Sequence, residues 1–260
     1  MFSPLIGIAV CLVGFVAYRL FKSPKIITIS IDGLIGSGKS TLIEKLKKKT
    51  DFVLIPEPLD KWFQYKDVDG KNILEKFYND KSRWGYTFQN VAFLTRVKAL
   101  TDAIEKINQS FGVNDIIKRI LGIPYILITE RSILTDKYVF AQMLFDEGII
   151  NQLEFSLYND WFVNHSPKIK FNNIIYVRTT VKNAVERIKS RGRMEEVNIP
   201  EKYLSDLETY HNKWLFKNNK EFNVLCLELN DVKSDLSSKE SLDKYESHII
   251  NISRFINDLE

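Results

Sequence analysis

One short segment constrains the fold of this chain more than any other part of its sequence. Residues 33–40 read G-L-I-G-S-G-K-S; they follow a β-branched apolar run at 25–33 and precede a segment in which Leu42 and Leu46 have helical spacing. This is the pattern of a phosphate-binding loop between a buried strand and a helix. Glycines let backbone N–H groups surround phosphate oxygens, and the helix N-terminus adds its dipole. The sequence therefore predicts a nucleoside triphosphate site.

The side chains of this loop have specific expected roles. Lys39 is expected to neutralise the β and γ phosphates of the nucleotide, and the Ser40 hydroxyl to hold Mg²⁺. The residues expected to contact the nucleotide are Gly33, Leu34, Ile35, Gly36, Ser37, Gly38, Lys39, Ser40 and Thr41. The loop indicates which molecule binds, but not which molecule receives a phosphate.

Short apolar runs alternate with helical segments along the rest of the chain. After the first run, further ones lie at 51–58, 124–132, 172–180 and 223–231. The long helical segments are expected at 84–107, 132–162 and 200–216. This alternation predicts an α/β fold, a five-stranded parallel sheet flanked by helices. Ligands of such sheets bind beyond the carboxyl ends of the strands, so polar residues just after each run are the site candidates.

The bulk composition narrows the class of protein. The formal net charge is +4, which suits anionic small molecules but is too weak to indicate nucleic-acid binding. Cys11 and Cys226 lie far apart in unlike contexts, which indicates no disulfide framework and suits a reducing compartment. The three histidines have no cysteine near them, so no zinc site is expected.

The N-terminal segment differs from the rest of the chain. No polar side chain occurs at residues 5–17, and the apolar run 2–21 reaches the roughly 20 residues needed to cross a bilayer if Arg19 snorkels. A cleaved signal peptide is one alternative, although its basic first region is missing; a buried core helix is another. The run predicts a membrane anchor at 2–21.

Cations follow this run rather than precede it. Arg19, Lys22 and Lys25 all lie after the apolar stretch, and the positive-inside rule then keeps the bulk of the chain on the cytosolic side. We therefore expect a hydrophobic segment and linker at 1–24 and one cytosolic domain at 25–260. Without the anchor, the protein would be cytoplasmic.

Charged residues follow the second and third apolar runs. Glu57 comes after the second, and Glu130 and Arg131 come after the third. Since all three fall at the same sheet edge as the loop, they would supply a base, a carboxylate near the metal and a cation for developing charge, as phosphoryl transfer requires. For each residue alone, a helix cap or a surface ion pair is the ordinary alternative.

A basic segment, RIKSRGRMEE at 187–196, follows the fourth run. A helix would place Arg187 and Arg191 on one face, and Gly192 would end that helix and free Arg193 to turn inward. The alternative is a solvated helix end, where the helix dipole favours cations.

These segments together resemble the deoxyribonucleoside kinase family of the deoxycytidine and deoxyguanosine kinase type, from about Lys25 onward. The motifs are GLIGSGKST (33–41), EPLDKW (57–62), TFQ (87–89), ERSILTDKYVF (130–140), RIKSRGRMEE (187–196) and DKYESHI (243–249). The resemblance implies ATP- and Mg²⁺-dependent 5′-phosphorylation of a deoxyribonucleoside, a reaction of nucleotide salvage, by a homodimer formed through long helices. A membrane-spanning start is not part of the family pattern.

The resemblance also implies residue roles in the transfer step. Glu57 would accept the proton of the 5′-hydroxyl, and Arg131 would steady the 5′-oxygen and the transferring phosphoryl group. Glu130 would help Ser40 to hold Mg²⁺. With Lys39, the residues expected to stabilise phosphate charge, as a lid over ATP, are Arg187, Arg191 and Arg193.

Around the nucleoside, the resemblance implies a second set of residues. Glu196 and Tyr78 would hydrogen-bond the sugar 3′-hydroxyl, and Tyr78 would crowd the 2′ position, so that deoxyribose fits better than ribose. Gln89 would read the base edge by paired hydrogen bonds. The aromatic residues expected to sandwich or wall the base are Trp62, Phe88 and Phe140.

One charged pair bears on the choice of base. Arg96 and Asp136 are implied at the back of the base pocket, which favours deoxycytidine, deoxyadenosine or deoxyguanosine over thymidine. An unpaired buried charge is costly, so the presence of both partners is coherent. The alternative is an ordinary ion pair between two helices.

Two other functions stay open at this level. A nucleoside monophosphate kinase of the thymidylate kinase type shares the loop, although Glu57 and the E-R-S motif indicate a neutral hydroxyl acceptor. A non-catalytic membrane-bound subunit with this fold, such as an accessory subunit of respiratory complex I, would be free to lose Lys39, Glu57 or Arg131, and all three are present. No guanine-reading N-K-x-D follows the loop, which disfavours a signalling GTPase.

Overall fold

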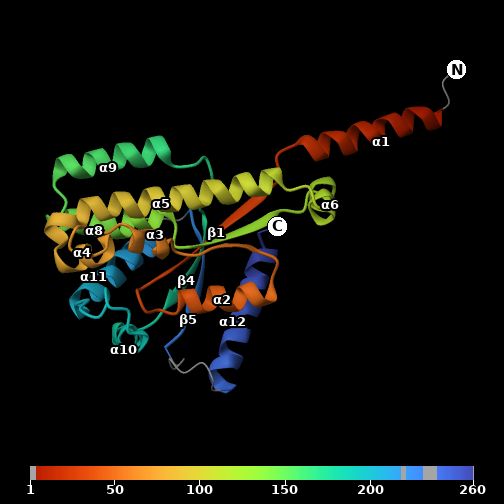
Figure 1. Cartoon of the computed structure of the whole chain (residues 1–260). Helices are drawn as coiled ribbons and strands as arrows, with labels where there is room; N and C mark the ends of the chain where they lie inside the picture. Colours follow the sequence, from red (N-terminus) through yellow and green to blue (C-terminus); the bar gives the residue numbers. More distant parts are fainter. Residues whose placement is uncertain (1–3, 218–220, 231–238, 260) are drawn as a thin grey trace.

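The computed structural model describes residues 4–217, 221–230 and 239–259, and a five-stranded sheet forms its centre (Figure 1). The strand order is β2-β3-β1-β4-β5, and every neighbouring pair is parallel. The strands are β1 (Ile26–Gly33), β2 (Val53–Ile55), β3 (Tyr125–Glu130), β4 (Asn173–Arg178) and β5 (Asn223–Glu228). Each lies inside its predicted run, which confirms the α/β fold with a five-stranded parallel sheet.

Helices cover both faces of this sheet (Figure 1). Those up to β3 are α1 (Pro4–Phe21), α2 (Lys39–Lys49), α3 (Leu59–Gln64), α4 (Ile73–Asn79), α5 (Lys81–Gln109) and α6 (Val113–Leu121). Those after β3 are α7 (Ile133–Thr135), the π-helix η1 (Asp136–Ala141), α8 (Gln142–Asp146), α9 (Gln152–His165), α10 (Val181–Arg191), α11 (Glu201–Asn212), the π-helix η2 (Lys213–Lys217) and α12 (Lys239–Asn257).

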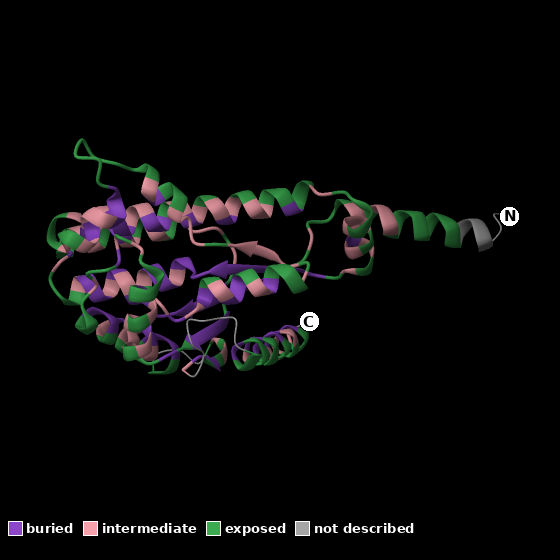
Figure 2. Ribbon diagram, turned by 60° about the horizontal axis from the view of Figure 1, so that its bottom comes forward, coloured by how far each residue is buried: buried purple, intermediate pink, exposed green. Residues whose placement is uncertain are grey.

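The central strands are buried on both faces, which explains their almost continuous apolar sequences. On one face of β3, Ile126 and Ile128 pack in a cluster with residues of α2 and α12. On the other, Tyr125 and Leu127 pack with α5 and α9. Figure 2 shows that buried residues concentrate in the strands and on the inward sides of the helices. The sheet is therefore a rigid layer that fixes the loops at its carboxyl edge.

The helix predicted at 132–162 is interrupted, which corrects the sequence interpretation. It consists of α7, η1 and α8, then a turn in which Gly148 has a φ of 71°, then α9. Asn151 caps α9 by accepting from the backbone N–H of Glu154. Helical periodicity does not show such breaks, and the π-helical turn η1 carries Asp136 and Phe140, two of the predicted site residues.

Helix α1 extends away from the rest of the molecule, and most of it is exposed (Figures 1 and 2). Two arginines form reciprocal hydrogen bonds between the C-terminal end of α1 and that of α6. Arg19 Nε donates to the carbonyls of Arg119 and Ile120 in α6, at 3.1 and 3.2 Å. Arg119 Nη1 donates in return to the carbonyls of Leu20 and Lys22, at 3.4 and 3.3 Å. Each arginine therefore satisfies carbonyls at the C-terminus of the other helix.

The membrane anchor predicted at 2–21 is not supported. Within the described residues, no helix is both long and apolar enough to cross a membrane. Arg19, which the prediction required to snorkel toward water, is held by the carbonyls of α6 instead. Residues 2 and 3 of the predicted anchor lie outside the described part of the chain.

Candidate active site

The loop at 33–40 has the backbone conformation that a phosphate cradle requires. Gly33, Gly36 and Gly38 all have positive φ, and helix α2 begins directly afterwards at Lys39. A Cβ atom on Gly36 would lie 2.6 Å from the carbonyl oxygen of Ala184, so no larger residue fits there. The N-terminus of α2 and the glycine backbone therefore face the space where phosphates would bind.

Lys39 lies buried at the centre of this cradle. Its Nζ donates to the carbonyl oxygens of Gly33 and Leu34, at 3.1 and 2.6 Å. Burial, together with the nearby Arg131 guanidinium, lowers the pKa of Lys39 to about 7. Phosphates bound in the loop would oppose that shift, because an adjacent anion favours the charged ammonium.

One cavity of about 380 Å³ joins the loop to the predicted acceptor residues. The predicted site residues that line it are Ile35, Gly36, Gly38, Lys39, Ser40, Thr41, Glu57, Trp62, Tyr78, Phe88, Gln89, Arg96, Glu130, Arg131, Asp136, Phe140, Arg187, Arg191, Arg193 and Glu196. Gly33, Leu34 and Ser37 belong to the loop without lining the cavity. Residues from six separate parts of the sequence therefore meet in one place.

Glu57 lies between two guanidinium groups at the middle of the cavity. Its Oε1 accepts from Arg96 Nη2 at 2.6 Å and from Arg131 Nη1 at 2.9 Å. Burial raises the pKa of this carboxyl, but the Arg131 and Arg96 charges outweigh burial and bring the pKa to about 2. Glu57 is therefore ionised at any physiological pH.

Arg131 has an unusual backbone conformation. Its φ of 61° is the one positive value among the non-glycine residues that the structure describes. Such a conformation costs on the order of 1–3 kcal/mol and occurs mainly at functional sites. Arg131 follows β3 and precedes Ser132, whose hydroxyl accepts from the N–H of Thr135 at 3.2 Å. The turn directs the guanidinium toward Glu57 and the Gly33 carbonyl, which lies 3.3 Å from Nη2.

The two predicted metal ligands are in contact. Ser40 Oγ donates to Glu130 Oε1 at 2.7 Å, across the carboxyl ends of neighbouring strands β1 and β3. A hydroxyl oxygen and a carboxylate oxygen are ligands that Mg²⁺ accepts, alongside water and substrate phosphates. Among the described residues, no group of three or more His, Cys, Asp and Glu could hold a metal by itself.

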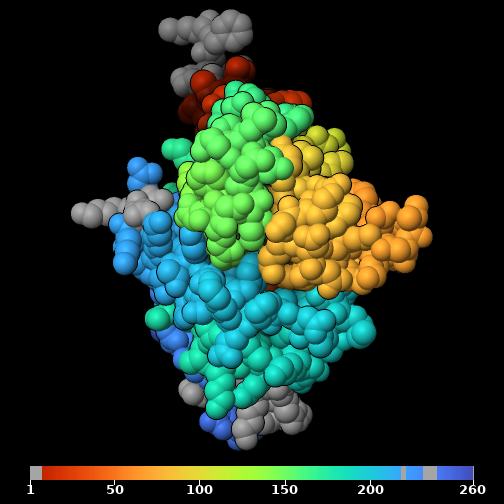
Figure 3. Space-filling model, turned by 90° about the vertical axis from the view of Figure 1, so that its left-hand side faces the viewer, coloured from red at the N-terminus to blue at the C-terminus, as the bar shows by residue number. Residues whose placement is uncertain are grey.

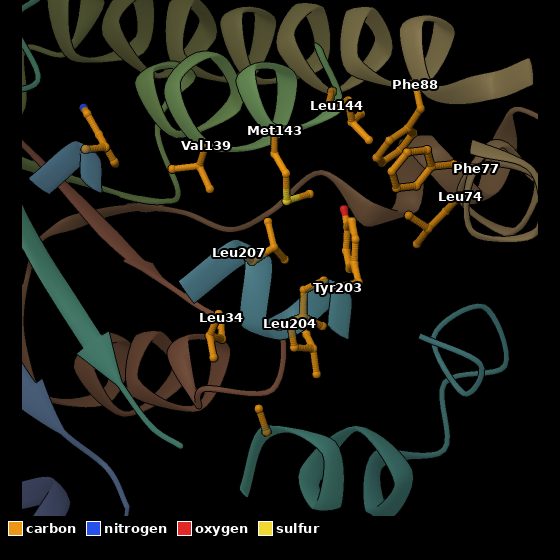
Figure 4. Close-up of a cluster of buried hydrophobic side chains, with 14 of the residues drawn as sticks. Leu34, Leu74, Phe77, Phe88, Val139, Met143, Leu144, Tyr203, Leu204 and Leu207 are labelled. Atoms are coloured by element: carbon orange, nitrogen blue, oxygen red, sulfur yellow. The ribbon is translucent and has the colours of Figure 1, made fainter. Parts of the chain in front are cut away.

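Aromatic rings form the walls of the acceptor half of the cavity, the part lined by Trp62, Phe77, Tyr78, Phe88, Gln89, Arg96, Asp136 and Phe140. Phe77 and Phe88 stack with ring centroids 4.6 Å apart, and Trp62 meets Phe88 edge-on at 5.1 Å. Figure 4 shows Phe77 and Phe88 facing each other, with the Tyr203 hydroxyl of α11 directed toward the same cluster. Such parallel and perpendicular rings suit a flat, planar ligand.

Polar groups converge at the back of this half. Arg96 Nε lies 3.1 and 3.0 Å from the two carboxylate oxygens of Asp136. Burial raises the pKa of Asp136 to about 6, although the Arg96 charge opposes this rise. Gln89 is 1% exposed, and its Oε1 has no hydrogen-bond partner within the described residues. A buried amide oxygen that lines a cavity is a ready acceptor for a ligand.

The three arginines predicted to form a lid all line the cavity, but their partners differ. Helix α10 ends at Arg191 with Gly192 at a φ of 65°, as the sequence predicted. Arg193 Nη1 contacts Glu196 Oε1 at 2.5 Å, and Arg191 pairs with Glu196 Oε2. Arg187 donates to the carbonyls of Gly36 and Ser37, at 3.5 and 3.3 Å, so it supports the loop itself.

Sequence analysis did not name six of the residues that line the cavity: Leu59, Leu74, Phe77, Ala92, Ser190 and Tyr245. Two of them are aromatic. Phe77 of α4 lines the cavity and stacks on Phe88. Tyr245 of α12 lines the loop side, where its Oη would lie 3.3 Å from a Cβ on Gly38. Tyr245 belongs to the DKYESHI motif, which had been matched without a role and could have indicated this position.

The loop, the strand order and the cavity together define a P-loop kinase. Comparison with known proteins identifies the group more closely. The family described as "Deoxynucleoside kinase" matches residues 29–251. The chain therefore belongs to the deoxynucleoside kinase family and is a kinase that phosphorylates a nucleoside, with ATP as the family's phosphate donor.

Individual relatives give the same assignment. The chain is 36% identical over 241 residues to deoxycytidine kinase 2 of Gallus gallus, with 82% of this chain and 86% of the relative covered. It is 30% identical over 255 residues to deoxycytidine kinase of Homo sapiens, with 92% and 94% covered. It is 28% identical over 233 residues to the mitochondrial deoxyguanosine kinase of Xenopus laevis, with 81% and 84% covered.

Proposed function

We propose that this kinase transfers the γ-phosphoryl group of ATP to the 5′-hydroxyl of a deoxyribonucleoside, and that it prefers deoxycytidine or a purine deoxynucleoside to thymidine. One observation carries the proposal. Glu57, a carboxylate kept ionised by Arg96 and Arg131, lies in the same cavity as the loop lysine Lys39. An acceptor hydroxyl beside Glu57 would then lie near the terminal phosphate.

The role proposed for Glu57 is to orient the 5′-hydroxyl and take its proton. A carboxyl with a pKa near 2 is a weak base toward a free alcohol. The alcohol becomes acidic only as its oxygen bonds to phosphorus, so proton transfer is expected late in the step. Arg131, bound to the same carboxylate oxygen, is placed to stabilise the charge on the attacking oxygen.

Charge on the transferring phosphoryl group needs stabilisation from several cations. Lys39 and the lid residues Arg191 and Arg193 line the loop side of the cavity. Ser40 and Glu130 are the residues that would hold Mg²⁺, which neutralises charge on the phosphate oxygens when bound. Their contact at 2.7 Å supports the proposed metal site, because both oxygens already converge on one point.

The proposed base preference rests on the acceptors at the back of the pocket. Gln89 Oε1 and the Asp136 carboxylate can each accept from an exocyclic amino group, as cytosine and adenine carry. Thymine presents a carbonyl oxygen at the position where cytosine has its amino group, so it would meet these acceptors with a repulsive contact. Arg96 holds Asp136 in place and offers a donor of its own.

We also propose a homodimer, on the basis of an exposed apolar stripe. Leu153, Leu157 and Trp161 of α9 lie at i, i+4 and i+8 and are 69%, 43% and 45% exposed. Leu94 on the neighbouring α5 is also exposed. A second copy would remove this face from water. Sedimentation should give a dimer for the native chain and a monomer for Trp161→Glu; a monomeric native chain would contradict the proposal.

A panel of acceptors tests the proposed activity. The native protein, supplied with ATP and Mg²⁺, should phosphorylate deoxycytidine or a purine deoxynucleoside faster than thymidine. Phosphorylation of deoxycytidine monophosphate but of no nucleoside would instead identify a monophosphate kinase. Absence of turnover with every nucleoside would favour the non-catalytic alternative. The ionised Glu57 at the acceptor position disfavours the monophosphate, whose phosphate would be repelled.

A further inference from the structure

A single side chain joins helix α4 to the segment that follows α10, two parts of the chain that contribute residues to different sides of the cavity. Asn72 precedes α4 and is buried, with 8% of its surface exposed. Its Oδ1 accepts from the N–H of Glu75 at 2.9 Å and so caps α4. Its Nδ2 donates to Glu195 Oε1 at 2.7 Å, although Glu195 lies 123 residues away in the sequence. An aspartate can cap a helix only as an acceptor, whereas the asparagine amide accepts through one atom and donates through another.

Helix α4 belongs to the acceptor half of the cavity. It places Leu74, Phe77 and Tyr78 on the cavity wall, and Phe77 stacks on Phe88 of α5. The position of α4 therefore sets the position of the proposed sugar and base contacts. In Figure 3, the surface of α4 (orange) lies directly against that of the lid and α11 (cyan).

The donor half of the cavity is lined by the loop together with Arg187, Arg191 and Arg193. Glu195 follows these arginines in the sequence and does not line the cavity itself. The next residue, Glu196, binds both Arg191 and Arg193. Glu195 and Glu196 therefore contact different parts of the molecule. Glu195 binds the residue that caps α4, and Glu196 binds the arginines proposed to face the phosphates. Because they are consecutive, the hydrogen bond from Asn72 to Glu195 also restrains where Glu196 and its two arginines lie.

We propose that Asn72 and Glu195 form a clasp that positions the arginine lid relative to the acceptor pocket, so that both are positioning residues for phosphoryl transfer. This inference rests on the proposed function, since it assigns the lid to ATP and α4 to the nucleoside. Transfer requires the donor and acceptor oxygens to be in line, and a small misplacement reduces the rate steeply. The clasp sets that alignment without touching either substrate.

The first test removes the donor of the hydrogen bond and then restores the bond in the opposite direction. Asn72→Asp keeps the cap on α4 but places a carboxylate against Glu195. It should lower kcat roughly tenfold or more, with both KM values within about threefold, because each half still binds its own ligand. Glu195→Gln keeps the acceptor oxygen and should behave like the native protein. When both substitutions are combined, the new glutamine amide on the lid can donate to the new carboxylate before α4, and kcat should recover.

A matched control separates the clasp from helix capping. Asn151 caps α9 in the same way, by accepting from the N–H of Glu154 at 3.0 Å, and its helix does not line the cavity. Asn151→Asp should therefore leave kcat unchanged. The clasp is disproved if Asn72→Asp keeps kcat within about twofold of the native value, or if the double variant stays as slow as Asn72→Asp.

A second variant tests the clasp in case Asn72→Asp does not fold. A second measurement tests it without relying on the proposed function. Glu195→Lys removes the acceptor from a partly exposed lid residue and should lower kcat as Asn72→Asp does. Amide hydrogen exchange at 193–199, measured without substrates, should be faster in Asn72→Asp than in the native chain. Unchanged exchange would overturn the clasp. A native chain that phosphorylates no nucleoside would overturn the proposed function, while the exchange result would still decide the clasp.

Discussion

The donor and acceptor halves of the cavity are built in different ways. The donor half comes mostly from one continuous segment, 33–41, whose backbone makes the phosphate cradle. The acceptor half comes from side chains on four elements, α3, α4, α5 and η1, represented by Trp62, Tyr78, Gln89 and Asp136. A continuous backbone site is tied to one local sequence, whereas a site of scattered side chains can be altered one contact at a time. Substitutions in the acceptor half should therefore change selectivity before they abolish transfer.

The largest expected effect is at the junction of the two halves. Glu57→Gln should leave ATP binding intact and lower turnover by roughly 10²–10⁴-fold, because it removes the group that takes the hydroxyl proton. Steady-state kinetics with the preferred nucleoside, together with ATP titration, measures both quantities. Unchanged turnover would show that Glu57 is not the base.

The next effect tests whether the acceptor half can be changed independently. Arg96→Met with Asp136→Ala removes the buried pair together, so that neither charge is left alone. The ratio of kcat/KM for thymidine to that for deoxycytidine should rise by about tenfold or more, the effect of about one polar contact. An unaltered ratio would contradict the assignment of this pair to the base, and the KM for ATP serves as the control.

The pH dependence of the two halves should also differ. The pKa of Asp136 is raised to about 6, so its carboxylate takes up a proton as the pH falls through that value. The KM for deoxycytidine should then rise below about pH 6, whereas Glu57, with a pKa near 2, stays ionised. Asp136→Asn should remove this dependence. A KM that stays flat from pH 5 to 8 in the native protein would contradict it.

The same shift has a consequence for stability. Because the folded-state pKa of Asp136 exceeds its ordinary value, this group favours folding at low pH and loses that contribution as pH rises through about 6. The ionisation of Glu57 contributes to stability in the opposite sense. Because its pKa is lowered in the folded state, the contribution is present at pH values above the ordinary pKa of a glutamate and is lost as the pH falls toward 2.

The smallest expected effect concerns the aromatic wall. Phe77→Leu removes the ring that stacks on Phe88 but keeps an apolar side chain at the position. The nucleoside KM should rise about threefold to tenfold, the worth of one aromatic pair, while the KM for ATP stays unchanged. If both KM values rise together, α4 supports the donor half as well, and the two halves are less separate than proposed.

The sequence predicted the donor half in detail because its residues are neighbours in the chain. The strand, the loop and the helix at Lys39 lie where the motif requires, and Gly192 ends α10 as expected. The acceptor residues could be named only through a family resemblance, since no local pattern distinguishes Gln89 or Arg96 from other residues of a long helix. The structure brings them together by packing α5 against η1.

Long-range contacts account for what the sequence interpretation missed. The hydrogen bond of Asn72 to Glu195 spans 123 residues, and no pattern at either end indicates it. Arg187 lines the cavity as expected, and its predicted role over the phosphates stays a prediction; its guanidinium also donates to carbonyls of the loop and of Leu229, which no local pattern indicates. The membrane anchor is not supported within the described residues, and the partners of Arg19, carbonyls of a helix 100 residues away, could not be read from the local sequence either.

The reciprocal arginine hydrogen bonds between α1 and α6 have a practical consequence. They fix α1 near the end of the sheet where β1 begins (Figure 1). The cavity lies at the other end, because residues that follow β1 and β3 line it. Cys11 is exposed on α1. With Cys226→Ser in the same chain, a dye or a support coupled to Cys11 would be held at a defined distance from the active site and would leave substrate entry unobstructed.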